Sequence, residues 1–167
     1  QAAELPLIEI PLPWPCSNEQ YGAIMGKAVD DARAQLQMDA VAFGDLYLED
    51  IRNYREQQMA GTGLELVFPL WQIPTDQLAQ QMIDGGLKAA ITCLDPSVMP
   101  EHLAGYQFGP ELLEQLPGSV DPCGENGEFH TFAWDGPMFK QPIPVMAGEV
   151  VNRDGFVYAD LLLEECQ

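Results

Sequence analysis

The chain has 167 residues, 47% of them hydrophobic, which is long enough and apolar enough for a compact fold with a buried core. Its 26 acidic and 7 basic residues give a formal net charge of -19, which repels phosphate backbones and anionic lipid headgroups. Nucleic acids and membrane surfaces are therefore excluded as expected partners. No apolar run approaches the roughly 20 residues of a membrane helix, so we expect a cytoplasmic protein.

The cysteines indicate free thiols. They are widely spaced and form no C-x-x-C pair, which argues against a zinc site and against a disulfide framework: Cys16, Cys93, Cys123 and Cys166. The chain also begins with Gln1, and its first residues resemble the end of a helix. We therefore expect a fragment of a longer protein.

The first half of the chain alternates predicted strands with predicted helices. Apolar runs predict strands over residues 7–12, 39–45, 64–71 and 87–94. Helical spacing predicts helices over residues 17–36, with Ser17 and Gln20 as a capping box, over residues 48–59, and from a Thr75 cap to Gly85. Because such alternation requires crossover connections, the fold class is α/β with a parallel sheet.

The pattern changes after Asp95, where prolines and glycines punctuate short elements. Residues 129–134 alternate like a strand, and residues 145–151 and 156–162 flank a turn at residues 152–155, which predicts a hairpin. We therefore expect one domain over residues 1–95 and a smaller α+β domain over residues 96–167.

Several residues follow the ends of the predicted parallel strands, where ligands of such sheets bind. Gly44 permits a close approach of the backbone, and Asp45 either contacts a ligand or caps the next helix. Arg52 either clamps an anion such as a nucleotide phosphate or pairs with Glu56 four residues on. Trp71 either stacks on a base or fills the core.

Residues 124–131, Gly-Glu-Asn-Gly-Glu-Phe-His-Thr, combine a glycine-bracketed loop with the start of a strand. We expect Glu125, Glu128 and His130 to converge there, with carboxylates able to bind Mg²⁺ and an imidazole able to transfer a proton. The alternative is a turn with solvated acids and a structural histidine. A second alternative is a thiol hydrolase in which Cys123 and His130 form a nucleophile pair.

This segment, together with Gly44-Asp45, Arg52, Glu56 and the Pro-Leu-Trp of residues 69–71, resembles the diphthine–ammonia ligase-like family of PP-loop ATP pyrophosphatases. The resemblance extends over nearly the whole chain. It implies a Rossmann-like (HUP-type) nucleotide-binding domain, incomplete at its N-terminus, followed by a family-specific substrate domain.

The resemblance also implies an ATP-dependent ligase that uses ATP and Mg²⁺. ATP is cleaved to AMP and pyrophosphate to activate a small-molecule or protein-borne carboxylate, and ammonia or another amine then forms an amide. The implied catalytic residues are Glu125, Glu128 and His130. The implied substrate contacts are Cys123, Gly124, Asn126, Gly127 and Thr131, and the implied nucleotide contacts are Gly44, Asp45, Arg52 and Trp71.

Two departures from the family pattern shape these expectations. No Ser-Gly-Gly-Lys-Asp-Ser type nucleotide loop occurs in the chain, so we expect the chain alone to be inactive. His130 stands where the diphthamide-forming ligases resemble one another in having glutamate, and the histidine form resembles the bacterial branch. The acceptor is therefore an unidentified carboxylate. The alternative function is a regulatory protein that binds an adenine nucleotide without cleaving it. The sequence leaves open whether the protein forms a homodimer.

Overall fold

The computed structural model describes residues 2–164, which form helices together with one parallel and one antiparallel sheet. This confirms the α/β class. The chain divides into two compact units: the N-unit, Pro6–Gln72, and the C-unit, which contains the described residues from Ile73 onward and residues 2–5. The division lies earlier than the expected boundary after residue 95, and Cys166 lies outside the described residues.

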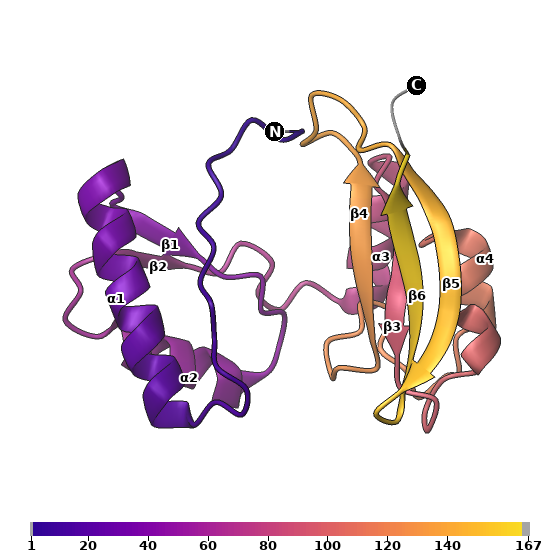
Figure 1. The fold of residues 1–167 in the computed structure, drawn as a ribbon, viewed down its shortest axis with the longest axis horizontal. Coiled ribbons are helices and arrows are strands. Elements are labelled where there is room, and N and C mark those ends of the chain that lie inside the picture. The colour runs from indigo at the N-terminus through magenta and orange to yellow at the C-terminus, as the bar shows by residue number, and fades with distance from the viewer. Residues whose placement is uncertain (1, 165–167) are drawn as a thin grey trace. The chain divides into compact units, whose positions relative to one another are not determined.

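The N-unit contains two helices and a two-stranded parallel sheet (Figure 1). Its elements are α1 (Asn18–Leu36), β1 (Ala40–Ala42), α2 (Glu49–Met59) and β2 (Glu65–Val67). The predicted capping box is confirmed, because the Gln20 amide donates to Ser17 Oγ at 3.2 Å and the Ser17 amide donates to Gln20 Oε1 at 3.0 Å. Strands β1 and β2 are parallel, as the crossover pattern predicted, with Val41 opposite Leu66.

The strand predicted over residues 7–12 is absent among the described residues. This stretch has no regular secondary structure and pairs with no strand of the described residues, and Leu7 is largely exposed. Apolar alternation favours a strand only where a neighbour supplies hydrogen bonds, and the prolines at positions 6, 11 and 13 remove donors from this one.

The C-unit is a four-stranded antiparallel sheet in the order β4-β3-β6-β5 (Figure 1). Its elements are α3 (Thr75–Asp84), β3 (Lys88–Leu94), the short 3₁₀ helix η1 (Glu101–Leu103), α4 (Pro110–Gln115), β4 (Phe129–Asp135), β5 (Val145–Arg153) and β6 (Phe156–Leu163). The predicted strand at residues 129–134 and the predicted hairpin are both confirmed. The hairpin turns through Asp154 and Gly155, both with positive φ.

Strand β3 corrects the expected parallel arrangement. It pairs antiparallel with β4, with Ile91 opposite Thr131, and antiparallel with β6, with Cys93 opposite Tyr158. A short apolar run fits a buried strand of either kind of sheet, so its composition alone does not determine the direction of pairing. The helices α3 and α4 both cover one face of this sheet (Figure 1).

The core of the C-unit lies between the sheet and these helices. Leu94 of β3, Leu103 of η1 and Leu112 of α4 are fully buried there, together with Phe129 at the start of β4. No helix among residues 2–164 is both long and apolar enough to cross a membrane.

Candidate functional site

The loop between α4 and β4 is fastened to the start of α3 through Asp121. Asp121 Oδ2 accepts a hydrogen bond from the Thr75 hydroxyl at 2.7 Å, and Oδ1 accepts one from the Cys123 amide at 2.8 Å. The Glu125 amide also points to Oδ1, at 3.4 Å. Thr75 was expected as a helix cap, but Pro74 holds the cap position and the Thr75 hydroxyl binds this loop instead.

Glu128 fastens the other end of the same loop from inside. Its side chain is buried, with 7% of its surface exposed, and its Oε1 accepts from the Asp121 amide at 2.9 Å and from Asn126 Nδ2 at 3.0 Å. Its Oε2 accepts from the Asn126 amide at 3.0 Å. Burial raises the pKa of Glu128, but the hydrogen bonds from Asn126 and Asp121 together lower it more, so the pKa lies below its ordinary value.

The two loop glycines are required for different reasons. Both have positive φ, +70° at Gly124 and +84° at Gly127, which other L-residues adopt at a cost. A Cβ at Gly124 would also lie 2.8 Å from the Phe129 carbonyl oxygen, whereas a Cβ at Gly127 would meet no atom within 4 Å. Gly124 therefore permits a close contact between the loop and β4, while Gly127 permits only a turn.

Gly124→Ala is expected to destabilise the C-unit more than Gly127→Ala. The strained backbone alone costs about 1–2 kcal/mol at either position, and the steric contact at Gly124 adds roughly 1–3 kcal/mol. Urea denaturation of the two variants and the wild type measures the difference in the free energy of unfolding. Equal losses would show that the Cβ contact with the Phe129 carbonyl is relieved without cost.

Cys123 lies within this loop, but its thiol is not prepared for nucleophilic attack. Its Sγ lies 3.3 Å from the Thr75 carbonyl oxygen, to which the thiol donates. Burial, with the negative charges of Asp121 and Glu125, raises the pKa of Cys123 to about 12. The thiol is therefore protonated near neutral pH, and nothing in its geometry supports a nucleophile pair with His130.

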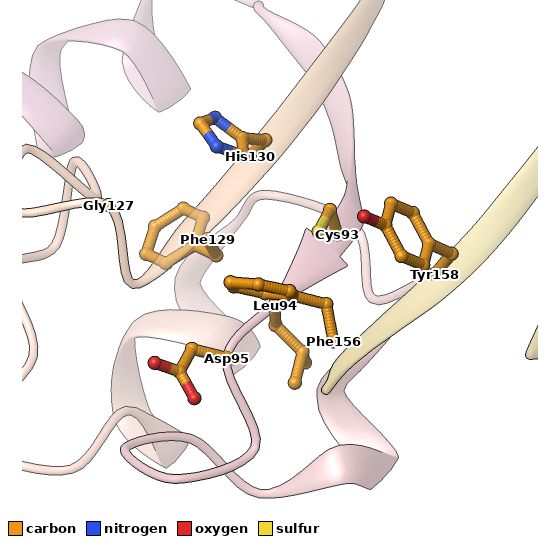
Figure 2. A pocket seen from close by; sticks show the side chains of 8 residues that line it. All are labelled: Cys93, Leu94, Asp95, Gly127, Phe129, His130, Phe156 and Tyr158. Carbon is orange, nitrogen blue, oxygen red and sulfur yellow. The ribbon is translucent and has the colours of Figure 1, made fainter. Parts of the chain in front are cut away.

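His130 is exposed on β4 and lines a hollow of about 200 Å³ beside the loop (Figure 2). Cys93 lies opposite His130 in the pairing of β3 with β4, and Tyr158 lies opposite Cys93 in the pairing of β3 with β6. Gly127 and Phe129 line the same hollow. Gly127 of the loop and the His130 imidazole therefore line the same hollow.

The structure brings some of the expected residues together and separates others. Gly127 and His130 share the hollow, and Thr131 follows on the exposed part of β4, whereas Glu128 is turned into the loop. Glu125 is half-buried, and its amide also contacts Asp121. The roles assigned to Glu125, Glu128 and His130 stay predictions.

The hollow is also lined by five residues that the sequence motifs did not indicate: Cys93, Leu94, Asp95, Phe156 and Tyr158. The Asp95 carboxylate accepts from the Ser97 amide at 2.8 Å, and hydrogen bonds from Ser97 lower its pKa. The sequence does place Cys93 and Asp95 close together at the end of one predicted strand, which could have indicated a site there. The meaning of this clustering depends on the antiparallel pairing with β4, which the sequence did not reveal.

The residues expected on the nucleotide side lie in the N-unit, beyond the carboxyl ends of β1 and β2. Arg52 lies over two rings that pack edge-on against each other, with its guanidinium carbon 4.6 Å from the Phe68 centroid and 4.7 Å from the Trp71 centroid. Its Nε also lies 2.9 Å from Glu56 Oε1, which is the ion pair considered as the alternative. Arg52 and Trp71 are thus brought together.

Asp45 faces Arg55 and does not cap α2. Its Oδ2 lies 3.7 Å from Arg55 Nε, and both atoms are buried without a hydrogen-bond partner. Leu48 holds the cap position of α2, with no side-chain hydrogen bond. Gly44 faces open space, since an added Cβ would meet nothing within 4 Å.

Across residues 2–164 no group of three or more histidine, cysteine or acidic side chains is arranged to hold a metal ion. The described part of the chain therefore offers no metal cage built from protein side chains alone.

Comparison with known proteins connects this architecture to one family. A family model described as the diphthamide synthase C-terminal domain matches residues 74–160, a stretch that lies within the C-unit and includes the whole loop from Asp121 to Glu128. The human diphthine–ammonia ligase is 30% identical over 159 residues, which cover 86% of this chain and 58% of the relative.

Two further relatives carry the same name. The cattle diphthine–ammonia ligase is 38% identical over 98 residues, covering 54% of this chain and 36% of the relative. The mouse protein is 30% identical over 131 residues, covering 74% of this chain and 48% of the relative. The chain thus spans between about a third and three fifths of the length of these relatives. Because the family model matches more than half of its 167 residues, the chain belongs to the diphthine–ammonia ligase-like family.

Proposed function

We propose that this chain is part of an ATP-dependent ligase that joins ammonia or another amine to a carboxylate. The observation that carries the proposal is the family match across the C-unit, which includes the loop fastened by Asp121 and Glu128. The curated relatives are named for ligation of diphthine with ammonia. The substrate of this chain is proposed only as a carboxylate, because the family resemblance implies a glutamate in the diphthamide-forming ligases at the position that His130 occupies here.

The C-unit would hold the acceptor. An oxygen of the acceptor carboxylate attacks the α-phosphorus of ATP, and pyrophosphate leaves. The amine nitrogen then attacks the acyl carbon, the bond from that carbon to the AMP oxygen breaks, and one proton leaves the nitrogen. We assign the role of accepting that proton to His130, and its exposed position at the hollow beside Gly127 supports this assignment.

The N-unit would hold part of the nucleotide. The Trp71 ring is an apolar surface of the kind on which a base stacks, and the Arg52 guanidinium, 4.7 Å from its centroid, carries donors for a phosphate. The side chains present therefore fit a nucleotide in chemical type. Mg²⁺ would arrive with the phosphates, since such sites commonly use few protein ligands.

The test is release of pyrophosphate by the complete gene product that contains these residues. With ATP, magnesium, ammonium and a panel of carboxylates, we expect pyrophosphate and AMP in equal amounts, formed only when a suitable carboxylate is present. An amide product identified by mass spectrometry would establish the second step.

Two outcomes would contradict the ligase proposal. Tight binding of adenine nucleotide without pyrophosphate release in the presence of any carboxylate of the panel would indicate a nucleotide-sensing regulator. Pyrophosphate release with equal rates in the presence and absence of carboxylate would indicate hydrolysis of ATP rather than activation of an acceptor.

A further inference from the structure

A second and larger hollow opens on the sheet of the C-unit. It measures about 620 Å³, within the range of about 300–1,000 Å³ that small-molecule sites occupy. Its walls are mainly apolar and come from all four strands of the sheet, and the large apolar side chains among them are Phe132 of β4, Val145 of β5, and Leu161 and Leu163 of β6. Phe132 is 40% exposed and Leu163 is 69% exposed, so large apolar side chains face this opening without cover.

The hollow exists because β6 stays paired with β3 over a short stretch only. The pairing consists of Cys93 with Tyr158 and Leu94 with Val157, whereas β6 continues to pair with β5 as far as Leu163. Residues 105–108 bond to β3 in place of β6 there, with the Ile91 amide donating to the Tyr106 carbonyl at 2.9 Å and an antiparallel bridge between Ala90 and Gln107. The side chains of β4 and β6, which are not neighbours in the sheet order, therefore line one shared opening across β3.

This hollow adjoins the one at His130. Cys93 and Tyr158 line both openings, and they lie side by side on β3 and β6 (Figure 2). Thr131, the residue after His130, lines the larger hollow. A ligand that reaches His130 can thus continue past Cys93 and Tyr158 into the larger hollow.

The polar side chains differ between the two hollows, and this difference indicates which end of an elongated ligand each hollow would hold. The smaller hollow contains His130, whose ring nitrogen can donate to a carboxylate, although the Asp95 carboxylate also lines it. The larger hollow contains the Asp160 carboxylate and no basic side chain. Asp160 would repel a carboxylate head there, where the donors are neutral groups such as the Tyr158 hydroxyl, whereas an apolar chain would bury Phe132 and Leu163.

We propose that the two hollows form one site for an elongated carboxylate, with its polar head at His130 and its apolar chain between β4 and β6. The proposal rests on the proposed ligase function for the identity of the head group as an acceptor. The chemical class is a small carboxylate with an unbranched or lightly branched hydrocarbon chain, and the larger hollow determines how long that chain can be.

Binding of straight-chain carboxylates to the complete gene product, without ATP, tests the proposal. Hexanoate, octanoate and decanoate are titrated by calorimetry, and affinity is expected to rise about fourfold for each added methylene that enters the hollow. Leu163→Ser is expected to weaken decanoate binding about tenfold, with a smaller effect on hexanoate. Phe132→Ser is a second variant at the opposite wall and is expected to act in the same direction.

Leu162→Ser is the matched control, because Leu162 is the neighbouring exposed leucine of β6, 51% exposed, and does not line the hollow. It should leave the chain-length dependence unchanged. The proposal is overturned if affinity does not depend on chain length, or if Leu162→Ser and Leu163→Ser weaken binding equally. Since no nucleotide is present, these outcomes are separate from failure of the ligase proposal, which pyrophosphate release tests.

Discussion

Glu128→Gln is expected to lower the free energy of unfolding of the C-unit by about 3 kcal/mol at pH 7. The substitution keeps the shape of the side chain, but it replaces one of the two acceptor oxygens with an NH₂ group that donates. The wild-type carboxylate accepts from the amides of Asp121 and Asn126 and from the Asn126 side chain. A glutamine amide group would direct donor hydrogens at one of these donors, in a place where 7% of the residue is exposed and water cannot substitute. Urea denaturation of the variant measures the loss.

The pH dependence of this difference follows from the lowered pKa of Glu128. A carboxyl group whose pKa is lower in the folded state contributes stability above its unfolded pKa of about 4.3, and this contribution is lost as pH falls through the folded value. The stability gap between wild type and Glu128→Gln should therefore be constant from pH 7 to about pH 5 and narrow below about pH 4. Glu114→Gln, an exposed glutamate of α4, is the control and should change little. A gap that widens on acidification would contradict the assignment.

The local elements of the fold were predictable because their signals are local. The Ser17 capping box, the helices after it and the hairpin around Asp154 and Gly155 each depend on residues within a few positions of one another. The sheet to which β3 belongs was not predictable in this way. Its apolar residues fit a parallel or an antiparallel neighbour equally well, and the pairing with β4 joins residues about 40 positions apart.

The candidate site likewise has features that the local sequence predicts and features that depend on contacts between distant residues. The glycine-bracketed loop was expected from its sequence, and positive φ at Gly124 and Gly127 agrees with a tight turn. The position of Glu128 was not foreseen, because strand alternation places it on the face of His130, whereas its carboxylate turns back to bind the Asp121 and Asn126 amides. The partners of His130 across the sheet likewise depend on register, which no short motif encodes.

His130→Ala is expected to lower amide formation by the complete gene product about 100-fold or more, while leaving pyrophosphate release during acceptor activation largely intact. Transfer of a proton to a positioned side chain typically contributes 10²–10⁴-fold, and in the proposed mechanism His130, which lines the hollow, receives the proton that leaves the amine nitrogen in the second step. The first step, attack of the acceptor carboxylate on ATP, releases no proton to this group. Single-turnover measurements of pyrophosphate and amide separate the two steps.

The second histidine of the chain supplies the control that distinguishes this role from loss of fold. His102 lies in η1, where its ring packs edge-on against Tyr106 at 6.3 Å, and it does not line the hollow. His102→Ala should retain amide formation. His130→Ala should retain the thermal midpoint of wild type, because the side chain is exposed, whereas Glu128→Gln should lower it. If His130→Ala instead abolishes nucleotide binding, the imidazole belongs to the nucleotide site. The assignment of His130 to the amide-forming step would then be wrong.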